Sequence, residues 1–283
     1  MVATPIGNLG DFSPRARETL AACALIAAED TRHSTVLLRH FGIKTPLVSL
    51  HGHNERERTP ALIARIAAGE DVALISDAGT PAISDPGQAL VRAAAAAGLE
   101  VVAVPGPCAA IAALSVAGLP TAAFAFEGFL PPRGGARRRR LGDLAAERRT
   151  LVFYEAPHRL REMLEDAAAT LGRERRAVVA RELTKLHEQV HRGDLGDLAA
   201  RAALEPSLAR GEIVVVIEGA AEAETADSAA ADLDRVLRVL LAELPLAQAA
   251  RLAARLVGAR DNEAYRRALA LRESDRSFDD PAT

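Results

Sequence analysis

Apolar and polar positions alternate in blocks along the first part of the chain. Short apolar runs rich in Val, Ile and Leu are each followed by a polar or Gly- and Pro-containing turn, and then by a helix-like segment. Such runs are typical of buried strands in a parallel sheet. The predicted strands are Met1–Thr4, Leu25–Ala28, Leu47–Leu50, Val72–Ile75 and Val101–Val104. We therefore expect a parallel α/β domain over residues 1–118, ending in a small-residue helix at Ala109–Val116.

A second series of strand-like runs begins after Leu119-Pro120. Its strands are predicted at Phe124–Phe129, Leu151–Tyr154, Ala177–Ala180, Glu188–Arg192 and Ile213–Glu218. A strongly basic helix is predicted at Ala136–Arg149, and further helices at His158–Leu171 and Asp197–Leu204. The pattern indicates a smaller α/β domain with a mixed sheet, over residues 119–220.

The last part of the chain has a helical pattern only. Ala220–Ser228 is acidic and small, which predicts a linker. Helices with an apolar stripe are predicted at Asp232–Leu244, Leu246–Val257 and Asn262–Arg272, with Asn262 as the cap of the last one. Residues 228–273 therefore predict a helix-turn-helix-like, RNA-binding unit, with Tyr265 available to stack on a base and Arg251, Arg255, Arg260, Arg266 and Arg267 on its outer surface. Residues 274–283 predict a disordered tail.

The stretch Asp71–Gly87 is the clearest candidate for a ligand-binding loop. Its apolar strand ends abruptly at Ser76, and Gly79 allows a close approach of ligand to backbone. In open α/β sheets, ligands bind at the carboxyl ends of strands. The helix after Cys108 directs its N-terminus to the same edge, where it favours a carboxylate. A cleft of backbone and small side chains suits an adenosine with an amino-acid tail.

Several classes of protein are disfavoured by the sequence. It has no dinucleotide-binding G-x-G-x-x-G after a first strand, no phosphate-binding P-loop and no G-x-S-x-G serine-hydrolase motif. Cys23 and Cys108 lie in different elements, so no disulfide is expected, and His51-Gly52-His53 is a weak metal signal, so no metal is expected. No apolar run is long enough to span a membrane and no leader is evident, which predicts a cytoplasmic protein.

The net charge of −3 does not by itself indicate a nucleic-acid partner, but the arginines are unevenly placed. Arg133 and Arg137–Arg140, with Arg148 and Arg149, outnumber the acidic residues near them. One interpretation is a solvated helix face, and the other is a surface that follows RNA phosphates beside the cleft.

Seven motifs in one order resemble a known family. They are Val2–Asp11, Ala27–Ser34, Ser76–Gly87, Val104–Pro120, Phe126–Pro131, Phe153–Leu160 and Arg181–Glu188. The chain is similar from Val2 to about Leu271 to the ribosomal RNA small subunit methyltransferase I family, within the tetrapyrrole methylase superfamily. The resemblance implies a class III methyltransferase: two α/β domains with a cleft for S-adenosylmethionine between them, plus the C-terminal helical unit. It also implies 2′-O-methylation of a cytidine in the decoding centre of 16S rRNA, within the 30S subunit, by a homodimer. The sequence departs from the family at its N-terminus, where members have a longer first strand.

The resemblance also assigns site residues. The second domain is expected to contribute Glu155, Leu183, Gly211 and Glu212, the last two near the adenine. The cofactor-binding positions implied are Pro5, Gly7, Asp77, Ala78, Gly79, Thr80, Ile83, Cys108, Ala109, Glu155, Leu183, Gly211 and Glu212. Expected substrate-binding residues are Arg32, Arg137, Arg138, Arg139 and Arg140.

A ribose 2′-hydroxyl is a poor nucleophile and benefits from a base. Asp30, Glu155, Glu182 and Lys185 follow predicted cleft-side strands, and we take Asp30, Glu182 and Lys185 as the catalytic candidates without choosing among them. An internal ion pair between Asp30 and Arg32 is an equal alternative to a substrate role. Two other functions stay open at this point: methylation of a tetrapyrrole or other small molecule, and non-catalytic RNA binding in ribosome assembly.

Overall fold

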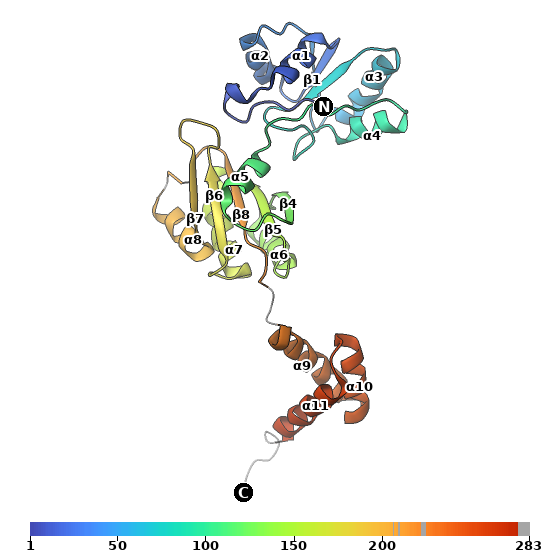
Figure 1. Ribbon diagram of the computed structural model, residues 1–283, viewed down its shortest axis with the longest axis vertical. Coiled ribbons are helices and arrows are strands. Elements are labelled where there is room, and N and C mark those ends of the chain that lie inside the picture. Colours follow the sequence, from blue (N-terminus) through green and yellow to red (C-terminus); the bar gives the residue numbers. More distant parts are fainter. Residues whose placement is uncertain (206, 209, 222–224, 277–283) are drawn as a thin grey trace. The chain divides into compact units, whose positions relative to one another are not determined.

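The two α/β parts of the chain fold together, and the C-terminal helices form a unit of their own. The computed structural model describes residues 1–205, 207–208, 210–221 and 225–276. Met1–Gly219 is one compact unit and Ala220–Thr283 is the second (Figure 1). No helix among the described residues is long and apolar enough to cross a membrane.

The first sheet has three parallel strands in the order β2-β1-β3. Its central strand β1 (Leu25–Ala28) pairs with β2 (Leu47–Ser49) and with β3 (Val72–Ile75). All four side chains of β1 are buried, because successive residues face opposite sides of a sheet and helices cover both sides. Ile26 belongs to the core with α1 and α2, whereas Leu25 belongs to the core with α3 and α4. These helices are α1 (Pro14–Ala22), α2 (Thr31–His40), α3 (Glu55–Ala67) and α4 (Gln88–Ala96).

The second sheet is mixed, as predicted, with the order β4-β5-β8-β6-β7. β8 pairs antiparallel with both β5 and β6, so the carboxyl ends of β4, β5 and β6 meet the start of β8 at one edge. One face of the sheet packs on α5 (Ala109–Ala117), and the other on α6, α7 and α8 (Figure 1). The remaining bounds are β4 (Phe124–Phe129), α6 (Gly134–Asp143), β5 (Thr150–Glu155), α7 (Leu160–Leu171), β6 (Arg176–Arg181), β7 (Gln189–Asp194), α8 (Leu195–Leu204) and β8 (Ile213–Ile217).

Several predictions about the first unit are wrong in detail. Met1–Thr4 and Val101–Val104 are not strands; they touch through one parallel bridge, between Val2 and Val104. Pro5 and Pro105 follow these segments and have no amide hydrogen with which to extend the pairing. α5 packs on the second sheet rather than the first, so the predicted boundary at Gly118 does not separate the two cores. The basic helix ends at Asp143, six residues early, because the chain turns there to begin β5.

The second unit contains three helices in its described part: α9 (Thr225–Glu243), α10 (Leu246–Val257) and α11 (Asp261–Arg276). Small and apolar residues of all three form its core, including Leu237, Ala253 and Ala264. α9 begins within the predicted linker, and α11 extends three residues into the predicted tail, whose residues 277–283 lie outside the described part.

Two side-chain predictions for this unit are wrong. Asn262 is the second residue of α11 and not its cap. Arg267 is not free on the outer surface, because it forms a two-bond ion pair with Asp234 of α9, at 2.6 and 2.8 Å. Arg251, Arg255, Arg260 and Arg266 are exposed as predicted, and Tyr265 is 47% exposed.

Glu55, at the start of α3, holds the beginning of α4. One of its carboxylate oxygens accepts hydrogen bonds from the amides of Gly87, Ala89 and Leu90, at 3.0, 2.8 and 3.2 Å. A negative charge beside the first amides of a helix is favourable. Glu55 thus fixes the last residues of the loop that follows β3.

We predict that Glu55→Ala lowers the free energy of unfolding by about 1–2 kcal/mol, because three amides lose their acceptor. Urea unfolding followed by circular dichroism measures the loss, and faster hydrogen exchange at residues 87–90 locates it. Glu57→Ala is the control, since Glu57 is exposed on the same helical turn and should cost about 0.5 kcal/mol or less. Equal effects from the two substitutions would contradict the capping role.

Candidate cofactor cleft

Three loops from the first sheet region converge at the edge of the second sheet. Thr4 and Gly79 exchange two backbone hydrogen bonds, of 2.9 and 3.1 Å. The Thr80 hydroxyl donates to the carbonyl of Pro107 at 3.0 Å. Gly79 has φ +81°, and a Cβ there would lie 3.2 Å from the side chain of Ile6. The loop after β3 is therefore fixed on both sides, and a larger residue at Gly79 would be strained as well as crowded.

The converging loops and the second sheet enclose a cavity of about 350 Å³, a size typical of small-molecule sites. Its walls come from the loop after β3, the start of α5, the ends of β4, β5 and β6, and the start of β8. The lining residues are Ile6, Ala78, Gly79, Thr80, Ile83, Ser84, Asp85, Cys108, Ala109, Phe129, Tyr154, Glu155, Ala156, Pro157, Ala180, Leu183, Gly211, Glu212, Ile213 and Val214.

The charged groups of this lining are all acidic. Asp85, Glu155 and Glu212 are present, and no Lys or Arg is among the described residues that line the cavity. A ligand with phosphate groups would find no cation to neutralise it. A ligand with a positive centre would be stabilised, because nearby opposite charge is favourable in a partly desolvated site.

Ten of the predicted cofactor positions line this cavity. They are Ala78, Gly79, Thr80, Ile83, Cys108, Ala109, Glu155, Leu183, Gly211 and Glu212. Pro5, Gly7 and Asp77 do not line it. Gly7 lies under Lys185, since a Cβ at Gly7 would approach the Lys185 Cγ to 2.5 Å. Asp77 accepts a hydrogen bond from the backbone of Asp30 at 3.0 Å, and so links the loops after β1 and β3.

The other ten lining residues were not predicted from the sequence. Seven of them lie inside the motifs that carry the family resemblance, which was the available signal: Ile6, Ser84, Asp85, Phe129, Tyr154, Ala156 and Pro157. Ala180, Ile213 and Val214 are apolar strand residues, and nothing local marks them as cleft residues rather than core residues.

Two loops of the cleft contain non-glycine residues in the left-handed region. Ala82 and Ser84 have φ of 70° and 65° in the loop after β3, and Glu182 and Thr184 have φ of 51° and 66° in the loop after β6. Each such residue costs about 1–3 kcal/mol, and strain of this kind gathers at functional sites. Both loops border the cavity, through Ser84 and Leu183.

Asp30 and Arg32 form the internal ion pair that was the alternative to a substrate role. The Arg32 guanidinium donates to both Asp30 oxygens, at 3.2 and 2.8 Å, and the Arg32 amide donates to Asp30 at 2.8 Å. The hydrogen bond from Arg32 holds the pKa of Asp30 well below its usual range. Asp30 is therefore a poor base, and it does not line the cavity.

Glu182 and Lys185 also form a pair. Lys185 Nζ is 2.9 Å from Glu182 and 3.2 Å from Glu212. The hydrogen bond from Lys185 lowers the pKa of Glu182. Burial alone would lower the pKa of Lys185, but these carboxylates outweigh it and the pKa is raised. Lys185 thus stays protonated and bridges the loop after β6 to the start of β8, outside the cavity lining.

Two carboxyl groups inside the cleft have raised pKa values. Burial raises the pKa of Glu155, whose side chain is 0% exposed and paired with Arg159. Burial also raises the pKa of Asp85; a hydrogen bond from Ser76 opposes this rise, and the charge of Asp77 adds to it. Asp85 differs from Glu155 in that no ion pair with a basic side chain involves it among the described residues.

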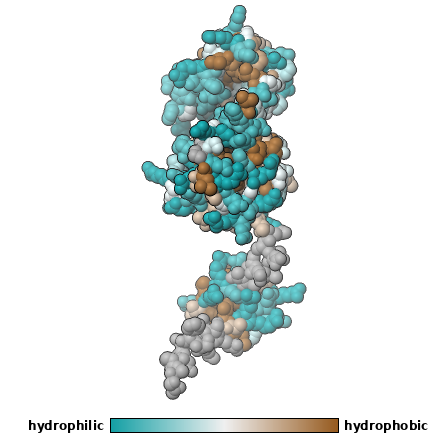
Figure 2. Space-filling view, turned by 90° about the vertical axis from the view of Figure 1, so that its left-hand side faces the viewer, coloured by the Kyte–Doolittle hydropathy of each residue, from teal (hydrophilic) through white to brown (hydrophobic). Residues whose placement is uncertain are grey.

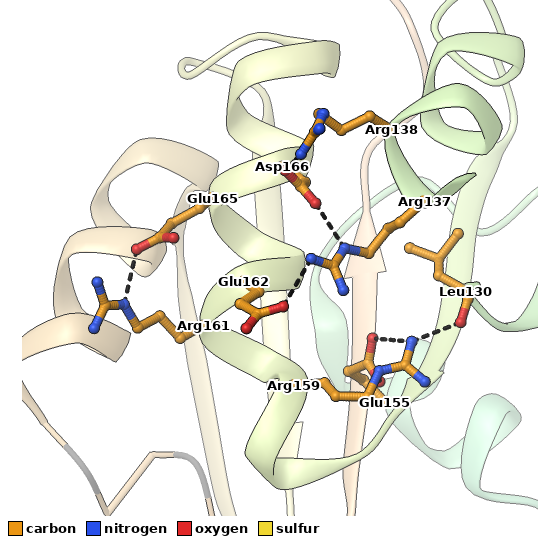
Figure 3. A network of polar contacts seen from close by, with 9 residues as sticks. All are labelled: Leu130, Arg137, Arg138, Glu155, Arg159, Arg161, Glu162, Glu165 and Asp166. Atoms are coloured by element: carbon orange, nitrogen blue, oxygen red, sulfur yellow. Dashed lines mark hydrogen bonds and ion pairs between the residues drawn. The ribbon is translucent and has the colours of Figure 1, made fainter. Parts of the chain in front are cut away.

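Most arginines of α6 form ion pairs with acidic residues of the same α/β unit, which the sequence did not reveal; Figure 3 shows Arg137 beside Glu162 and Asp166. Arg137 is buried and donates to Asp166 at 2.7 Å and to Glu162 at 3.0 Å, both on α7. The side chain is 3% exposed, so the prediction that Arg137 binds substrate is not supported. Arg138 also contacts Asp166, and Arg140 contacts Glu127 of β4. Arg139 is exposed, with no ion pair among the described residues.

The histidines that gave a weak metal signal do not form a site in this structure. The rings of His51 and His53 are 6.0 Å apart. Within the described ranges, no group of three or more His, Cys, Asp or Glu side chains is placed to hold a metal ion.

The fold and the cleft place the chain among the tetrapyrrole methylases. Residues 1–199 match the Tetrapyrrole (Corrin/Porphyrin) Methylases family model. Among solved structures, uroporphyrin-III-C-methyltransferase from Thermus thermophilus has a TM-score of 0.54 at 23% identity, over 77% of this chain and 92% of that one. A second structure of a uroporphyrin-III C-methyltransferase from the same organism, complexed with S-adenyl homocysteine, has a TM-score of 0.53 at 18% identity, covering 77% and 95%. At this identity, the likeness concerns the fold alone.

Relatives of higher sequence identity show which group of tetrapyrrole methylases the chain belongs to. Ribosomal RNA small subunit methyltransferase I of Pseudomonas aeruginosa is 56% identical over 95% of this chain and 95% of its own length. The Escherichia coli O157:H7 protein of the same name is 50% identical over 95% and 93%. Residues 227–272 match the RsmI C-terminal HTH domain model. The chain therefore belongs to the ribosomal RNA small subunit methyltransferase I family, which confirms the predicted family and fold class.

We predict very different stability effects for two arginines of α6. Arg137→Ala should lower the free energy of unfolding by about 2–3 kcal/mol, because it removes a buried side chain together with its hydrogen bonds to two carboxylates. Arg139→Ala should change it by about 0.5 kcal/mol or less, since Arg139 is exposed. Thermal and urea unfolding measure both. A stable, soluble Arg137→Ala protein would show that this arginine is not part of the core.

Proposed function

We propose that the protein transfers the methyl group of S-adenosylmethionine to the ribose 2′-hydroxyl of a cytidine in 16S rRNA, with the 30S subunit as substrate and a homodimer as the working form. The single observation that carries the reaction class is the cleft, which combines glycine and backbone walls with acidic side chains and no cation. The names of the close relatives support ribosomal RNA as the substrate.

The residues present fit S-adenosylmethionine. Its sulfonium is positive, which suits a lining whose charged side chains are all carboxyls. Glu155 and Glu212 are already paired with Arg159 and Lys185, so Asp85 would contribute most to this attraction. Cys108 and Ala109 line the cavity at the start of α5, and Cys108 makes no side-chain cap, so their amides would hold the carboxylate of the methionine part. The amide of Ala110 already donates to the Tyr154 hydroxyl. Ala180, Leu183 and Val214 give an apolar wall for the adenine beside Gly211 and Glu212. When bound, the cofactor supplies an activated methyl group.

We propose Asp85 as the base, in place of Asp30, Glu182 and Lys185. Those three are held in ion pairs beside the cavity, whereas the Asp85 carboxyl lines it. In this role an Asp85 oxygen would accept the proton of the 2′-hydroxyl while the hydroxyl oxygen takes the methyl group in place of the sulfur, with S-adenosylhomocysteine as the leaving group. A carboxyl with a raised pKa is a better proton acceptor than an ordinary one.

The proposed RNA contacts lie outside the cavity. Arg133 and Arg139 are exposed on or next to α6, and Arg138 keeps a 57% exposed side chain despite its ion pair. On the second unit, exposed Arg251, Arg255 and Arg266 and the ring of Tyr265 offer phosphate and base contacts. A methylase of small molecules needs neither set.

The proposed function predicts one missing modification. Deletion of the gene should remove a single 2′-O-methyl cytidine from 16S rRNA, and the purified protein with S-adenosylmethionine should restore it on 30S subunits from the deletion strain. Mass spectrometry of rRNA fragments measures both. Methylation of a different base atom, or of a porphyrin-type substrate instead of 30S subunits, would contradict the proposal.

The proposed base gives a pH prediction. Because only ionised Asp85 accepts the proton, activity should fall as the pH drops through its raised pKa. Asp85→Asn should lose about 10²–10⁴-fold in kcat and also lose this acidic limb. Glu57→Gln is the control, since Glu57 is an exposed carboxyl that does not line the cavity, and it should keep both kcat and the acidic limb. Calorimetry with S-adenosylhomocysteine should show unchanged binding in both variants; an unchanged pH profile in Asp85→Asn would exclude this base.

A further inference from the structure

An exposed aromatic ring stands at the edge of the cleft. Aromatic residues are scarce in this chain, with 7 Phe, 2 Tyr and no Trp. Of the rings in the described part, Phe124, Phe129 and Tyr265 are the exposed ones, at 39%, 55% and 47%. Phe129 is the one of these three that lines the cavity. Exposure of a large apolar ring to water is unfavourable, and a ligand that covers the ring would remove this cost.

The backbone of β4 is irregular in a way that places this ring. Phe126 pairs with Val152 and Phe129 with Tyr154, so three steps along β4 match two steps along β5. The extra residue is a β-bulge at Glu127–Gly128, where Gly128 has φ +64°. Without it, Phe126 and Phe129 would face opposite sides of the sheet. With it, both rings lie on the side of Tyr154, with centroid distances of 4.9 and 5.7 Å.

The loop that contains Asp85, the proposed base, lies next to β4 at the bulge, one residue from Phe129. A Cβ at Gly128 would lie 3.2 Å from the hydroxyl of Ser84, the residue before Asp85. The planes of Phe129 and Tyr154 differ by 64°, so the two rings meet edge to face and are not stacked. With its exposure of 55%, Phe129 retains ring surface for another planar group.

We propose that Phe129 is the stacking surface for the base of the target nucleotide. This inference rests on the proposed function and specifies how the acceptor is held. Proteins that recognise RNA by sequence commonly stack an unpaired base on an aromatic side chain, and enzymes that act on a base take it out of its stack. Phe129 and Asp85 line the same cavity, so a base on Phe129 would bring its ribose into the cleft that holds Asp85. The phosphates of the nucleotide would lie outside the cleft, near residues 130–133 between β4 and α6, where Arg133 is exposed.

Charge favours a nucleotide over an apolar protein segment as the occupant. Glu127, two residues before Phe129, is paired with Arg140, so its charge does not oppose a phosphate. Arg133, just before α6, and Arg139, within α6, are both exposed. Neither makes an ion pair among the described residues. An apolar peptide would leave these cations without a partner.

The test compares non-aromatic and aromatic residues at this position. Phe129→Leu should raise the KM for 30S subunits roughly ten- to hundredfold, since stacking on one base is lost. Phe129→Tyr and Phe129→Trp should keep the KM within about threefold of the parent. Phe124→Leu is the matched control: it removes an exposed ring from the other end of the same strand, outside the cavity, and should leave the KM unchanged.

A second readout does not depend on methyl transfer. Because the chain has no tryptophan, Phe129→Trp introduces a single indole whose emission is quenched by a stacked base. Oligocytidylate, added with S-adenosylhomocysteine present, should quench Phe129→Trp and not Phe124→Trp. If the parent protein failed to methylate 30S subunits, the proposed function would fail while this quenching still tested the stacking.

Three results would overturn the proposal. The first is an unchanged KM in Phe129→Leu. The second is a loss of S-adenosylhomocysteine affinity in calorimetry that matches the loss of activity, which would place the ring against the cofactor. The third is equal quenching of the two tryptophan variants. Thermal melting checks that Phe129→Leu is folded, which its exposure leads us to expect.

Discussion

The two backbone hydrogen bonds between Thr4 and Gly79 are the interaction on which the cleft depends. They join the N-terminal segment to the loop after β3. Two residues before Thr4, Val2 bonds to Leu74 of the first sheet, and two residues after it, Ile6 belongs to the core of the second sheet. Residues 2–6 therefore connect both cores, and Ile6 lines the cavity. Small residues are required here, since a side chain at Gly7 would meet Lys185 and one at Gly79 would meet Ile6.

The strained loops are held by contacts that lie away from the cavity. The loop with Ala82 and Ser84 is fixed at its end by the Glu55 carboxylate, and the loop with Glu182 and Thr184 by Glu188, which accepts the Thr184 amide at 2.6 Å. Charge-assisted hydrogen bonds of this kind offset part of the cost of left-handed residues. The loops can thus present backbone groups to a ligand without rearranging when it binds, which reduces the entropic cost of binding.

The sequence predicted the strands and the loops well where the pattern was local. Leu25–Ala28, Val72–Ile75 and Phe124–Phe129 are strands with the predicted bounds, because apolar runs between turn residues determine them. Ten of the cofactor positions implied by the family resemblance line the cavity, so here the resemblance supplied what no local pattern marked. The side of the sheet on which α5 packs was not predictable, because an apolar helix of small residues fits either core. Nor was the bulge in β4, which depends on one left-handed glycine and on the register with β5.

The arginines of α6 show why composition alone overstates an RNA-binding surface. Three of the four in Arg137–Arg140 have carboxylate partners, namely Asp166, Glu162 and Glu127, which are far from them in sequence. Arg137 is buried between α6 and α7, and its charge is used in ion pairs that join these two helices. The positive charge left for phosphates is therefore spread over single exposed arginines rather than concentrated in one run. Separate contacts of that kind give weak attraction to any RNA, because each contributes its own small share of counterion release. Selection of one nucleotide must then come mainly from the shape and chemistry of the cleft that receives it, where an acidic lining and an open ring lie side by side.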